Sequence, residues 1–433
     1  MTTRQITPLD AVLVAIDIAK ARNEVLIEFP DRQRRRKLSI RNTRDDHDRL
    51  VGLLAETGKL VICGFEATGN YHRPIAWRLI QAGFDVRLVS SMAAARTREA
   101  LHNSWDKNDP KDAQVILHML RIGATQHYHD PLLAGINDVQ ELSKTHEAIS
   151  RSKTEILHQI QTHYLPLYFP EVERFRQSSR SEWFFAFLEM FPTPASVTAL
   201  EEDAFIKAAW QVVGRKVAKA TLLADIYQTS RASIALPIPL DAPAITMFRM
   251  VLAEARSLIR QRDTIEKMAD AMLTQSADYQ QLRKIPGIGP INALSIIAEA
   301  GDIRRFGHHR QFLKFCGLDL STQQSGAFRG RTKLSKYGNA RLRRTLWMAA
   351  QVAIRQRENS FRDKFERYIA RDRDNPDLRR KALTAITAIT AKMARVVHAV
   401  IKSGSDYRPF FEGAVPGGRT PLRGAVRAQS ATL

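Results

Sequence analysis

The chain has 433 residues, of which 44% are hydrophobic, enough apolar sequence for more than one folded core. Lysine and arginine total 66 against 45 aspartate and glutamate residues, a formal net charge of +21. Such an excess of one sign repels itself in a compact protein unless a polyanion offsets it. Nucleic acid is the usual polyanion, so the charge favours a nucleic-acid partner. A generically basic surface is the alternative.

Several other classes of protein are disfavoured. The two cysteines, Cys63 and Cys316, lie too far apart in sequence for a zinc finger, and two are too few for a disulfide framework. The N-terminal apolar run is interrupted by Asp17, which is not typical of a signal peptide. The apolar stretch 382–401 contains threonines and two basic residues, which favours a buried helix over a membrane span. We therefore expect a cytoplasmic protein with no membrane partner.

The first part of the chain, 1–130, alternates short strands with helices. Strands are expected at 12–19, 23–29, 36–42, 60–69 and 85–91, and helices at 45–58, 71–83 and 108–123. The first three strands are predicted to form an antiparallel meander. The order β-β-β-α-β-α-β-α is that of an RNase H-like, or RuvC-like, α/β fold, and we expect such a domain here.

The middle of the chain, 131–281, is predicted to be a helical linker domain whose longest helix covers 244–281. An apolar series spaced by seven residues runs along this helix: Val251, Leu258, Ile265 and Met272. A companion series three residues earlier comprises Phe248, Ala255, Arg262 and Ala269. Sustained over four heptads, the pattern indicates a coiled coil. A helix within an intrachain bundle is the alternative.

A mainly helical domain is expected over 282–411, and it opens with a helix–hairpin–helix sequence. The segment IPGIGP (285–290) joins two helices through Gly287 and Gly289. Glycine lets a backbone approach a phosphate, and the next helix N-terminus offers free N–H groups. We expect phosphate binding here without sequence readout; an ordinary Pro-Gly connector is the alternative. Residues 412–433 are predicted to form a disordered basic tail.

Four carboxylates lie where a metal site can form. Asp17 lies within the first apolar strand, where an acid is costly unless it is hydrogen-bonded or binds a metal. Glu66 ends the fourth strand, and sites in open α/β sheets form at strand ends. Asp109 fits an N-cap position and Asp112 the first turn of the same helix, so both can point the same way.

Each acid alone has a structural interpretation, as a helix cap or as the end of a strand. Together they supply the oxygen ligands that Mg²⁺ prefers. Two ions about 4 Å apart can clamp the attacking and leaving oxygens of a phosphoryl transfer. We therefore predict that Asp17, Glu66, Asp109 and Asp112 form a catalytic site for Mg²⁺, with two ions per site.

A glycine-rich, cationic segment follows at 315–350. Ser325 lies in a polar turn before Gly326, and on the residues alone Ser321 and Ser335 are equal rivals. A serine nucleophile needs help with deprotonation and with the charge on phosphate, and nearby cations supply the second. The cations predicted to contact nucleic acid here are Arg329, Arg331, Lys333, Lys336 and Arg341, beside Gly287 and Gly289.

These motifs resemble those of the DEDD-type insertion-sequence transposases. The N-terminal match comprises Asp17 in VAIDIAK, Glu66 in GFEATGNY, and Asp109 and Asp112 in DKNDPKDA. The C-terminal match comprises IPGIGPINALSIIAEAGDIRRF, FCGLDLSTQQSG and TKLSKYGNARLRRTLWMAA. The resemblance extends over nearly the whole chain, and the acidic quartet shows no departure from it. The segment around Ser325 resembles the Ser-Gly motif of that family, which favours Ser325 over the other two serines.

The resemblance implies an RNA-guided recombinase, in which a noncoding RNA pairs with donor and target DNA. It implies that Ser325 is the nucleophile, linked covalently to DNA, beside Mg²⁺ held by the acidic quartet. It also implies a homo-oligomer, a dimer or tetramer, whose subunits share each site and associate partly through the coiled coil. We expect a transposase that cuts and rejoins DNA. The alternatives are a metal-dependent nuclease of the junction-resolvase type, using activated water, and a non-catalytic nucleic-acid scaffold.

Overall fold

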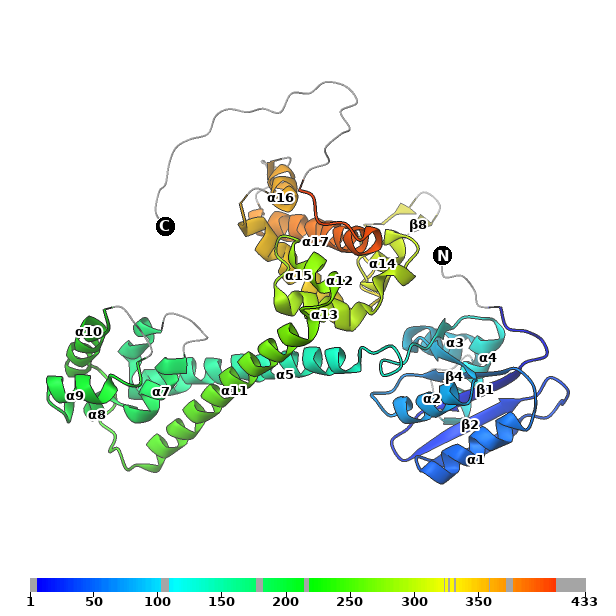
Figure 1. Cartoon of the computed structure of the whole chain (residues 1–433), viewed down its shortest axis with the longest axis horizontal. Coiled ribbons are helices and arrows are strands. Elements are labelled where there is room, and N and C mark those ends of the chain that lie inside the picture. The colour runs from blue at the N-terminus through cyan, green and yellow to red at the C-terminus, as the bar shows by residue number, and fades with distance from the viewer. Residues whose placement is uncertain are drawn as a thin grey trace, which may run out of the picture. The chain divides into compact units, whose positions relative to one another are not determined.

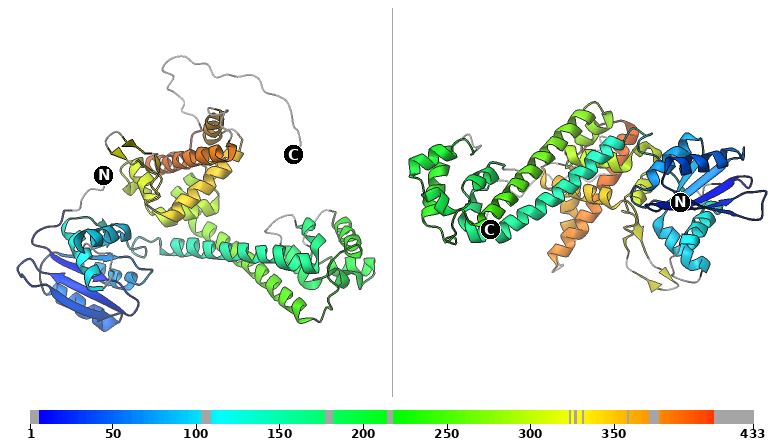
Figure 2. Two further views of the ribbon diagram at one scale, coloured as in Figure 1. Left: turned by 180° about the vertical axis from the view of Figure 1, so that it is seen from behind. Right: turned by 90° about the horizontal axis from the view of Figure 1, so that it is seen from below.

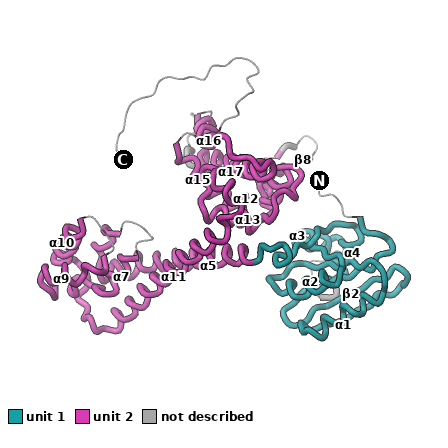
Figure 3. Tube along the Cα trace, in the orientation of Figure 1, with its two compact units in different colours: residues 1–137 teal, residues 138–433 magenta. Residues whose placement is uncertain are grey.

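The computed structural model of the chain describes residues 6–102, 109–176, 182–213, 218–322, 324–325, 328–330, 332–357, 359–370 and 377–409. The chain divides into two compact units, residues 1–137 and 138–433 (Figures 1 and 3). The first is a mixed α/β domain and the second is mainly helical. The tail predicted at 412–433 lies outside the described residues.

A six-stranded sheet forms the centre of the first unit, in the order β3-β2-β1-β4-β5-β6. The strands are β1 (Val12–Asp17), β2 (Arg22–Glu28), β3 (Arg36–Arg41), β4 (Val61–Glu66), β5 (Asp85–Val89) and β6 (Gln126–His127). β1, β2 and β3 pair antiparallel, as the predicted meander requires, while β1, β4 and β5 are parallel neighbours. The predicted strands and helices occur in the predicted order, and the structure adds a helix at Ser91–His102 and the strand β6, which is antiparallel to β5.

Strand alternation divides the apolar residues of β1 between two cores. Val14 and Ile16 pack with α1 (Arg44–Ala55) and α2 (His72–Gln81), whereas Leu13 and Ala15 pack with residues of α3 (Ser91–His102) and α4 (Asp109–Arg121). The sheet therefore lies between two pairs of helices, as the ribbon shows (Figure 1). Thr43 caps the start of α1, because its side chain accepts the backbone N–H of Asp46.

The helix α4 lies very close to the sheet and runs against the direction of β1 and β4. A Cβ at Gly64 would lie 2.7 Å from the side chain of Leu120, so only glycine fits beneath the C-terminal end of α4. The hydroxyl of Thr7, just before β1, donates to the carbonyl of Leu120 at 2.7 Å. The C-terminal end of α4 is thus near the start of β1. The opposite end of α4, which carries Asp109 and Asp112, is directed toward the strand ends.

The second unit contains two hydrophobic cores. Helices of the first part are α5 (Asn137–Gln159), the π-helix η1 (Ile160–Tyr164), α6 (Leu165–Tyr168), the 3-10 helix η2 (Pro170–Phe175), α7 (Glu182–Met190), α8 (Pro194–Thr198), α9 (Glu202–Ala209), α10 (Lys219–Arg231) and α11 (Pro243–Leu273). Helices of the second part are α12 (Ala277–Arg283), α13 (Pro290–Ala300), the 3-10 helix η3 (Ile303–Arg305), α14 (His309–Phe315), α15 (Ala340–Arg355), α16 (Ser360–Ala370) and α17 (Leu378–Ser403).

The two long helices α5 and α11 contribute to both of these cores. Ile156 and Leu252 belong to the first core, whereas Val139 and Leu273 belong to the second. The helices cross (Figure 2). His146 of α5 lies 3.3 Å from a carboxylate oxygen of Glu266 on α11. Because the long helices continue from one core into the other, the boundary expected after residue 281 falls inside one compact unit. The boundary expected after residue 130 lies at residue 137.

The helix predicted at 244–281 is in fact two helices. α11 ends at Leu273, and Ser276 caps α12 by accepting the N–H of Tyr279 at 3.4 Å. The heptad prediction is also corrected in part. Phe248 and Ala255 are buried as predicted, but Leu252 and Ile259 are the buried partners of that series, while Met272 is exposed. In the described residues this face of α11 packs within its own chain, partly on α7.

The apolar stretch predicted as a buried helix forms α17. Its segment Arg380–Ser403 is long and apolar enough to cross a membrane, and half of it is buried inside the protein. Ile389, Met393 and Val397 are fully buried in the core that α17 shares with α12, α14, α15 and α16. The apolar character of α17 is therefore that of a helix at the centre of a core.

Candidate functional site

Asp17 and Glu66 occupy matching positions at the ends of two adjacent strands. β1 and β4 run parallel with Ile16 opposite Phe65, so Asp17 and Glu66 follow that pair at the same edge of the sheet. Alternation places Asp17 on the face of Ala15, and places Glu66 on the face of Gly64. That is the face on which α4 packs. The structure thus brings these two predicted acids together, both half-buried.

A third carboxylate at this edge was not identified from the sequence. Glu24 of β2 lies directly opposite Asp17 in the antiparallel register, so both side chains share one face. Its carboxylate accepts a hydrogen bond from the Ser39 hydroxyl at 2.6 Å. The alternation of polar and apolar residues along 23–29 was the available signal, because it places Glu24 on the opposite face from Val25.

Asp112 is buried and paired with a cation of the neighbouring helix. The residue is 6% exposed, and its Oδ1 accepts from Arg98 Nε at 2.7 Å and from Nη2 at 2.5 Å. The pair connects α3 to α4 beside the strand ends. Arg98 was also absent from the sequence prediction. Asp109 is the first residue of α4, and its side chain lies outside what the structure describes.

The donor chemistry of this edge suits a hard divalent cation, because its ligands are carboxylate oxygens. Within the described side chains, no group of three or more Asp, Glu, His or Cys residues is close enough to hold a metal ion. Asp17 and Glu66 contribute two carboxylates, and one oxygen of Asp112 is bonded to Arg98. The described side chains therefore do not form a metal site by themselves, and metal binding by the four predicted acids stays a prediction; the side chain of Asp109 lies outside the described part of the chain.

Ser325 lies on a two-stranded antiparallel ribbon in the second unit. β7 (Leu320–Ser321) pairs with β10 (Lys333–Leu334), and β8 (Gln324–Ser325) pairs with β9 (Phe328–Arg329). The two pairs are nested in sequence, and the described residues among 320–334 are called the serine ribbon. Ser325 opposite Phe328 is the innermost described pair, and Ser325 is exposed. The fold therefore presents its hydroxyl far from the base of the ribbon.

The three candidate serines differ in their surroundings. Ser335 lies at the base of the serine ribbon, where its hydroxyl donates to the carboxylate of Asp319 and its N–H donates to the Asp319 carbonyl at 2.9 Å. This serine holds the base of the ribbon together. Ser321 pairs with Lys333 and is exposed, as is Ser325. The geometry thus separates Ser335 from its two rivals.

The cations predicted around Ser325 have different environments. Lys333 and Lys336 are exposed, and Lys336 adopts the left-handed conformation with φ of 57°. Both can reach a ligand in solvent. The side chain of Arg329 lies outside the described part of the chain, and so does the whole of Arg331.

Arg341 instead connects three helices. Its Nε donates to Glu147 of α5 at 2.5 Å, and its Nη1 donates to Glu299 of α13 at 2.5 Å. Only 31% of its side chain is exposed. Arg341 therefore has an internal structural role in α15, beside the nucleic-acid contact that was predicted for it.

The two glycines predicted to contact a phosphate, Gly287 and Gly289, also have different surroundings. Gly287 has φ of 86°, and a Cβ there would lie 2.1 Å from the carbonyl oxygen of Ala349 and 2.8 Å from the N of Ala353. The close approach of α15 therefore explains the glycine. Gly289 precedes α13 as its N-cap residue, with open space around it. The turn between α12 and α13 thus leaves Gly289 accessible to a phosphate, and binding there stays a prediction.

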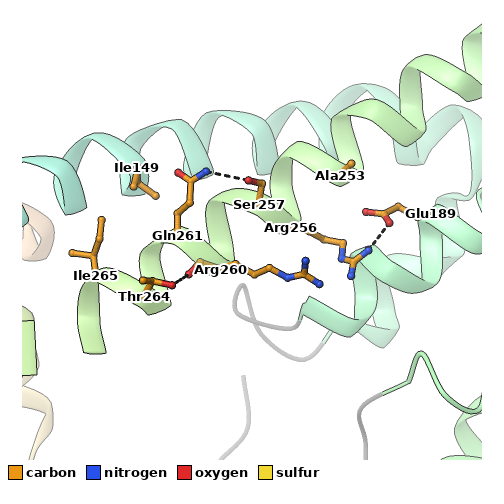
Figure 4. A pocket seen from close by; sticks show the side chains of 9 residues that line it. All are labelled: Ile149, Glu189, Ala253, Arg256, Ser257, Arg260, Gln261, Thr264 and Ile265. Carbon is orange, nitrogen blue, oxygen red and sulfur yellow. Dashed lines mark hydrogen bonds and ion pairs between the residues drawn. The ribbon is translucent and has the colours of Figure 1, made fainter. Parts of the chain in front are cut away.

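A cavity of about 500 Å³ lies along α11 and contains no predicted site residue. Arg256 projects there toward Glu189 of α7, with Nη1 to Oε2 at 2.5 Å (Figure 4). Arg260 of the same wall donates to Glu182 at 2.6 Å. The arginines of this cavity are thus paired within the protein.

Two family profiles match the chain in the order expected for one protein. A profile for the DEDD transposase of the IS110 type matches residues 14–170, which include Asp17, Glu66, Asp109 and Asp112. A profile described as the transposase IS116/IS110/IS902 family matches residues 279–366, which include Ser325. Both halves of the predicted site thus lie within matched segments.

Individual relatives agree with the profiles. A protein of Pseudomonas aeruginosa named as a probable family 20 transposase is 31% identical over 174 residues, 40% of this chain and 50% of the relative. A protein of Streptomyces coelicolor whose name describes a mini-circle transposase for IS117 is 26% identical over 326 residues, 73% of this chain and 78% of the relative. The transposase for insertion sequence element IS1111A of Coxiella burnetii is 35% identical over 94 residues, 22% of this chain and 26% of the relative.

The chain thus spans half the length of the first of these relatives and more than three quarters of the second. The two profiles, the ordered motifs and the relatives all agree on one assignment. The chain belongs to the IS110 family of DEDD transposases.

Proposed function

We propose that this protein is a transposase that cuts and rejoins DNA strands by transesterification, with Ser325 as the nucleophile. The observation that carries the proposal is the placement of Asp17 and Glu66 at matching strand ends, on the face covered by α4. The sheet order and strand directions support an RNase H-like fold for this domain. Such an edge suits phosphoryl transfer, and the exposed Ser325 on its cationic ribbon supplies a hydroxyl for it.

In the proposed reaction, Ser325 Oγ attacks a phosphorus atom of the DNA backbone. One Oγ–P bond forms and one P–O bond to the adjoining nucleotide breaks. The serine loses its hydroxyl proton and the leaving oxygen gains one. No oxidant or reductant is needed, and the phosphodiester becomes a phosphoserine diester. A hydroxyl of a different DNA strand then attacks the same phosphorus atom. A new P–O bond to that strand forms, the P–Oγ bond breaks, and the proton lost by the DNA hydroxyl is balanced by the one that Ser325 regains.

The carboxylates at the strand ends and at the start of α4 are called the acidic edge: Asp17, Glu24, Glu66, Asp109 and Asp112. They have distinct proposed roles. Asp17, Glu66, Asp109 and Asp112 would hold divalent cations, Mg²⁺ and two per site, which would offset the negative charge of the transferring phosphate. Arg98 holds Asp112 through Oδ1 and so fixes the direction of its second oxygen. Glu24 lies next to Asp17 and adds to the negative potential that attracts cations to this edge.

Cations in the second unit have the complementary task. Lys333 and Lys336 are exposed near the base of the serine ribbon and would hold the DNA backbone against Ser325. Arg329 and Arg331 of the same ribbon would join them, and Gly289 would bind a further phosphate through the N-terminus of α13. These contacts carry no base specificity.

Sequence specificity in this proposal comes from a noncoding guide RNA that pairs with donor and target DNA. The family resemblance supports this partner, and the net charge of +21 is compatible with binding two nucleic acids. The family resemblance also supports a homo-oligomer, a dimer or a tetramer, in which subunits share each site.

A recombination assay in cells tests the proposal. A plasmid carrying the element ends is supplied with the wild-type protein, Ser325→Ala, or the matched control Ser321→Ala. Ser321 is a matched control because both serines are exposed on the same ribbon. We expect Ser325→Ala to abolish strand exchange, because it removes the proposed nucleophile, and Ser321→Ala to retain it. A hydrolytic nuclease that uses activated water predicts that Ser325→Ala still cuts DNA at the wild-type rate, which would overturn the proposal.

A further inference from the structure

Four cations gather where α16 packs against α17, away from the serine ribbon in sequence. Lys364 and Arg367 are three residues apart on α16, and Lys392 and Arg395 are three residues apart on α17, so each pair shares one side of its helix. The two helices contact each other in the C-terminal core (Figure 1). These four residues are called the α16–α17 cationic cluster.

Within the described residues, carboxylates balance only part of this cluster: Asp363 raises the pKa of Lys392, against the larger opposite effect of burial. Among the residues that the structure describes, Lys364, Arg367 and Arg395 form no ion pair. Arg367 Nε donates only to the backbone carbonyl of Asp363, at 3.3 Å. The other nearby acid, Glu366, is occupied by Arg362 at 2.8 Å. Among the described residues, the cluster therefore carries a net positive charge that a polyanion can neutralise.

Lys392 is the most enclosed member of the cluster. Its Nζ donates to the carbonyl of Ser360 at 2.5 Å and lies 5.1 Å from the centre of the Phe361 ring. Both contacts favour a cation, yet burial, followed by the charges of Lys364 and Arg367, lowers the pKa of Lys392 to about 8. Burial and the charges of Arg395 and Arg367 likewise lower the pKa of Lys364. The four cations therefore repel one another in the free protein.

We propose that the α16–α17 cationic cluster is a second nucleic-acid site that binds a phosphate backbone. A row of phosphates relieves repulsion among fixed cations and releases its own counterions, whereas a single inorganic anion neutralises only part of the cluster. The chemistry is common to DNA and RNA, and the experiment below distinguishes them. The inference does not depend on the chemistry of Ser325, since binding here requires no strand cleavage.

The test is the salt dependence of binding, measured with the full-length protein. Lys364→Gln/Arg367→Gln removes two charges of the cluster. The matched control, Lys207→Gln/Arg231→Gln, removes one exposed lysine and one exposed arginine from α9 and α10. Each variant is titrated with a short DNA duplex and a short RNA duplex, both of unrelated sequence, over about 50 to 200 mM salt. Thermal unfolding of each variant verifies that it folds.

We expect the cluster variant to lose about 1 to 2 units from the slope of log affinity against log salt, and the control to keep the wild-type slope. Loss with both duplexes supports a shared site, and loss with only one identifies the nucleic acid that occupies it. Unchanged slopes with both duplexes, or an equal loss in the control, would overturn the proposal. Recombination can fail through Ser325 while these slopes remain wild-type, so the two proposals fail separately.

Discussion

Arg98 and Asp112 form a buried ion pair beside the acidic edge, with Arg98 Nε 2.7 Å from Asp112 Oδ1. Their side chains are 12% and 7% exposed. Removing one member of such a pair leaves the other charged, buried and unpaired. We therefore predict that Arg98→Met lowers the free energy of unfolding by about 3 kcal/mol.

The double variant Arg98→Met/Asp112→Asn removes both charges and should be more stable than Arg98→Met alone. Urea unfolding of the wild type, both single variants and the double variant measures the coupling. Losses that simply add in the double variant would show that the pair has no energetic coupling.

Gly287 and Gly289 give a second prediction. They are two residues apart, but a side chain would meet the backbone of α15 at Gly287 and no atom at Gly289. Gly287→Ala forces a Cβ against the backbone of α15 in a left-handed conformation, and should destabilise the protein by about 3 kcal/mol. Gly289→Ala meets no atom and should change stability by less than about 1 kcal/mol. Thermal unfolding of the two variants compares them, and equal losses would contradict the packing explanation of Gly287.

Arg341 and Lys333 should separate stability from binding. Arg341→Gln removes the cation that pairs with Glu299, and leaves Glu147 with only the longer ion pairs to Arg344 at 3.4 Å and Arg151 at 3.7 Å. We expect a loss of about 2 kcal/mol in unfolding free energy. Lys333→Gln removes an exposed charge, so stability should be unchanged while the salt slope of DNA binding falls by about 1. Urea unfolding and DNA titration of both variants check this. The reverse assignment of effects would show that Arg341 is the DNA contact.

The pH dependence of stability gives a fourth prediction. The pKa of Lys392 in the folded protein is lowered to about 8, from a usual value of 10.5. Between these values the unfolded chain binds more protons than the folded one, so this lysine makes stability rise with pH from about 8 to about 10.5. Lys364, Arg367 and Asp363 are the charged groups that act on it.

Lys392→Met should flatten that rise, measured as the difference in urea midpoint between about pH 7 and about pH 10. Lys207→Met, at an exposed site on α9, is the control and should keep the wild-type rise. An identical rise in the wild type and in Lys392→Met would mean that another group is responsible.

The acidic edge could be predicted from the sequence because strand alternation and parallel strand ends are local rules. Asp17 and Glu66 follow apolar runs, and those rules place both on one face. Arg98 could not be found in this way, since its pairing with Asp112 depends on how α3 packs against α4. Glu24 was accessible to the same alternation rule, although its place opposite Asp17 required the register.

The corrections in the second unit also have physical causes. Leu252 and Ile259 of α11 are buried, but the next residue at the same spacing is Glu266. A charged residue does not fit an apolar heptad series, so this series was not recognised in the sequence. The neighbouring series ending at Ile265 and Met272 therefore matched the heptad template better. Gly287 was ambiguous because a phosphate and the backbone of α15 both require glycine at close approach, and only the tertiary structure distinguishes them.

The central claim is that Ser325 becomes covalently linked to DNA. The protein is incubated with Mg²⁺, a DNA duplex bearing the element ends and the noncoding RNA of the element that the proposal requires. The mixture is denatured during the reaction, digested with protease and nuclease, and analysed by mass spectrometry. We predict a nucleotide attached to the peptide that contains Ser325, absent in Ser325→Ala and retained in Ser321→Ala. Cleaved DNA with no nucleotide attached to that peptide, or attachment at another serine, would contradict the account.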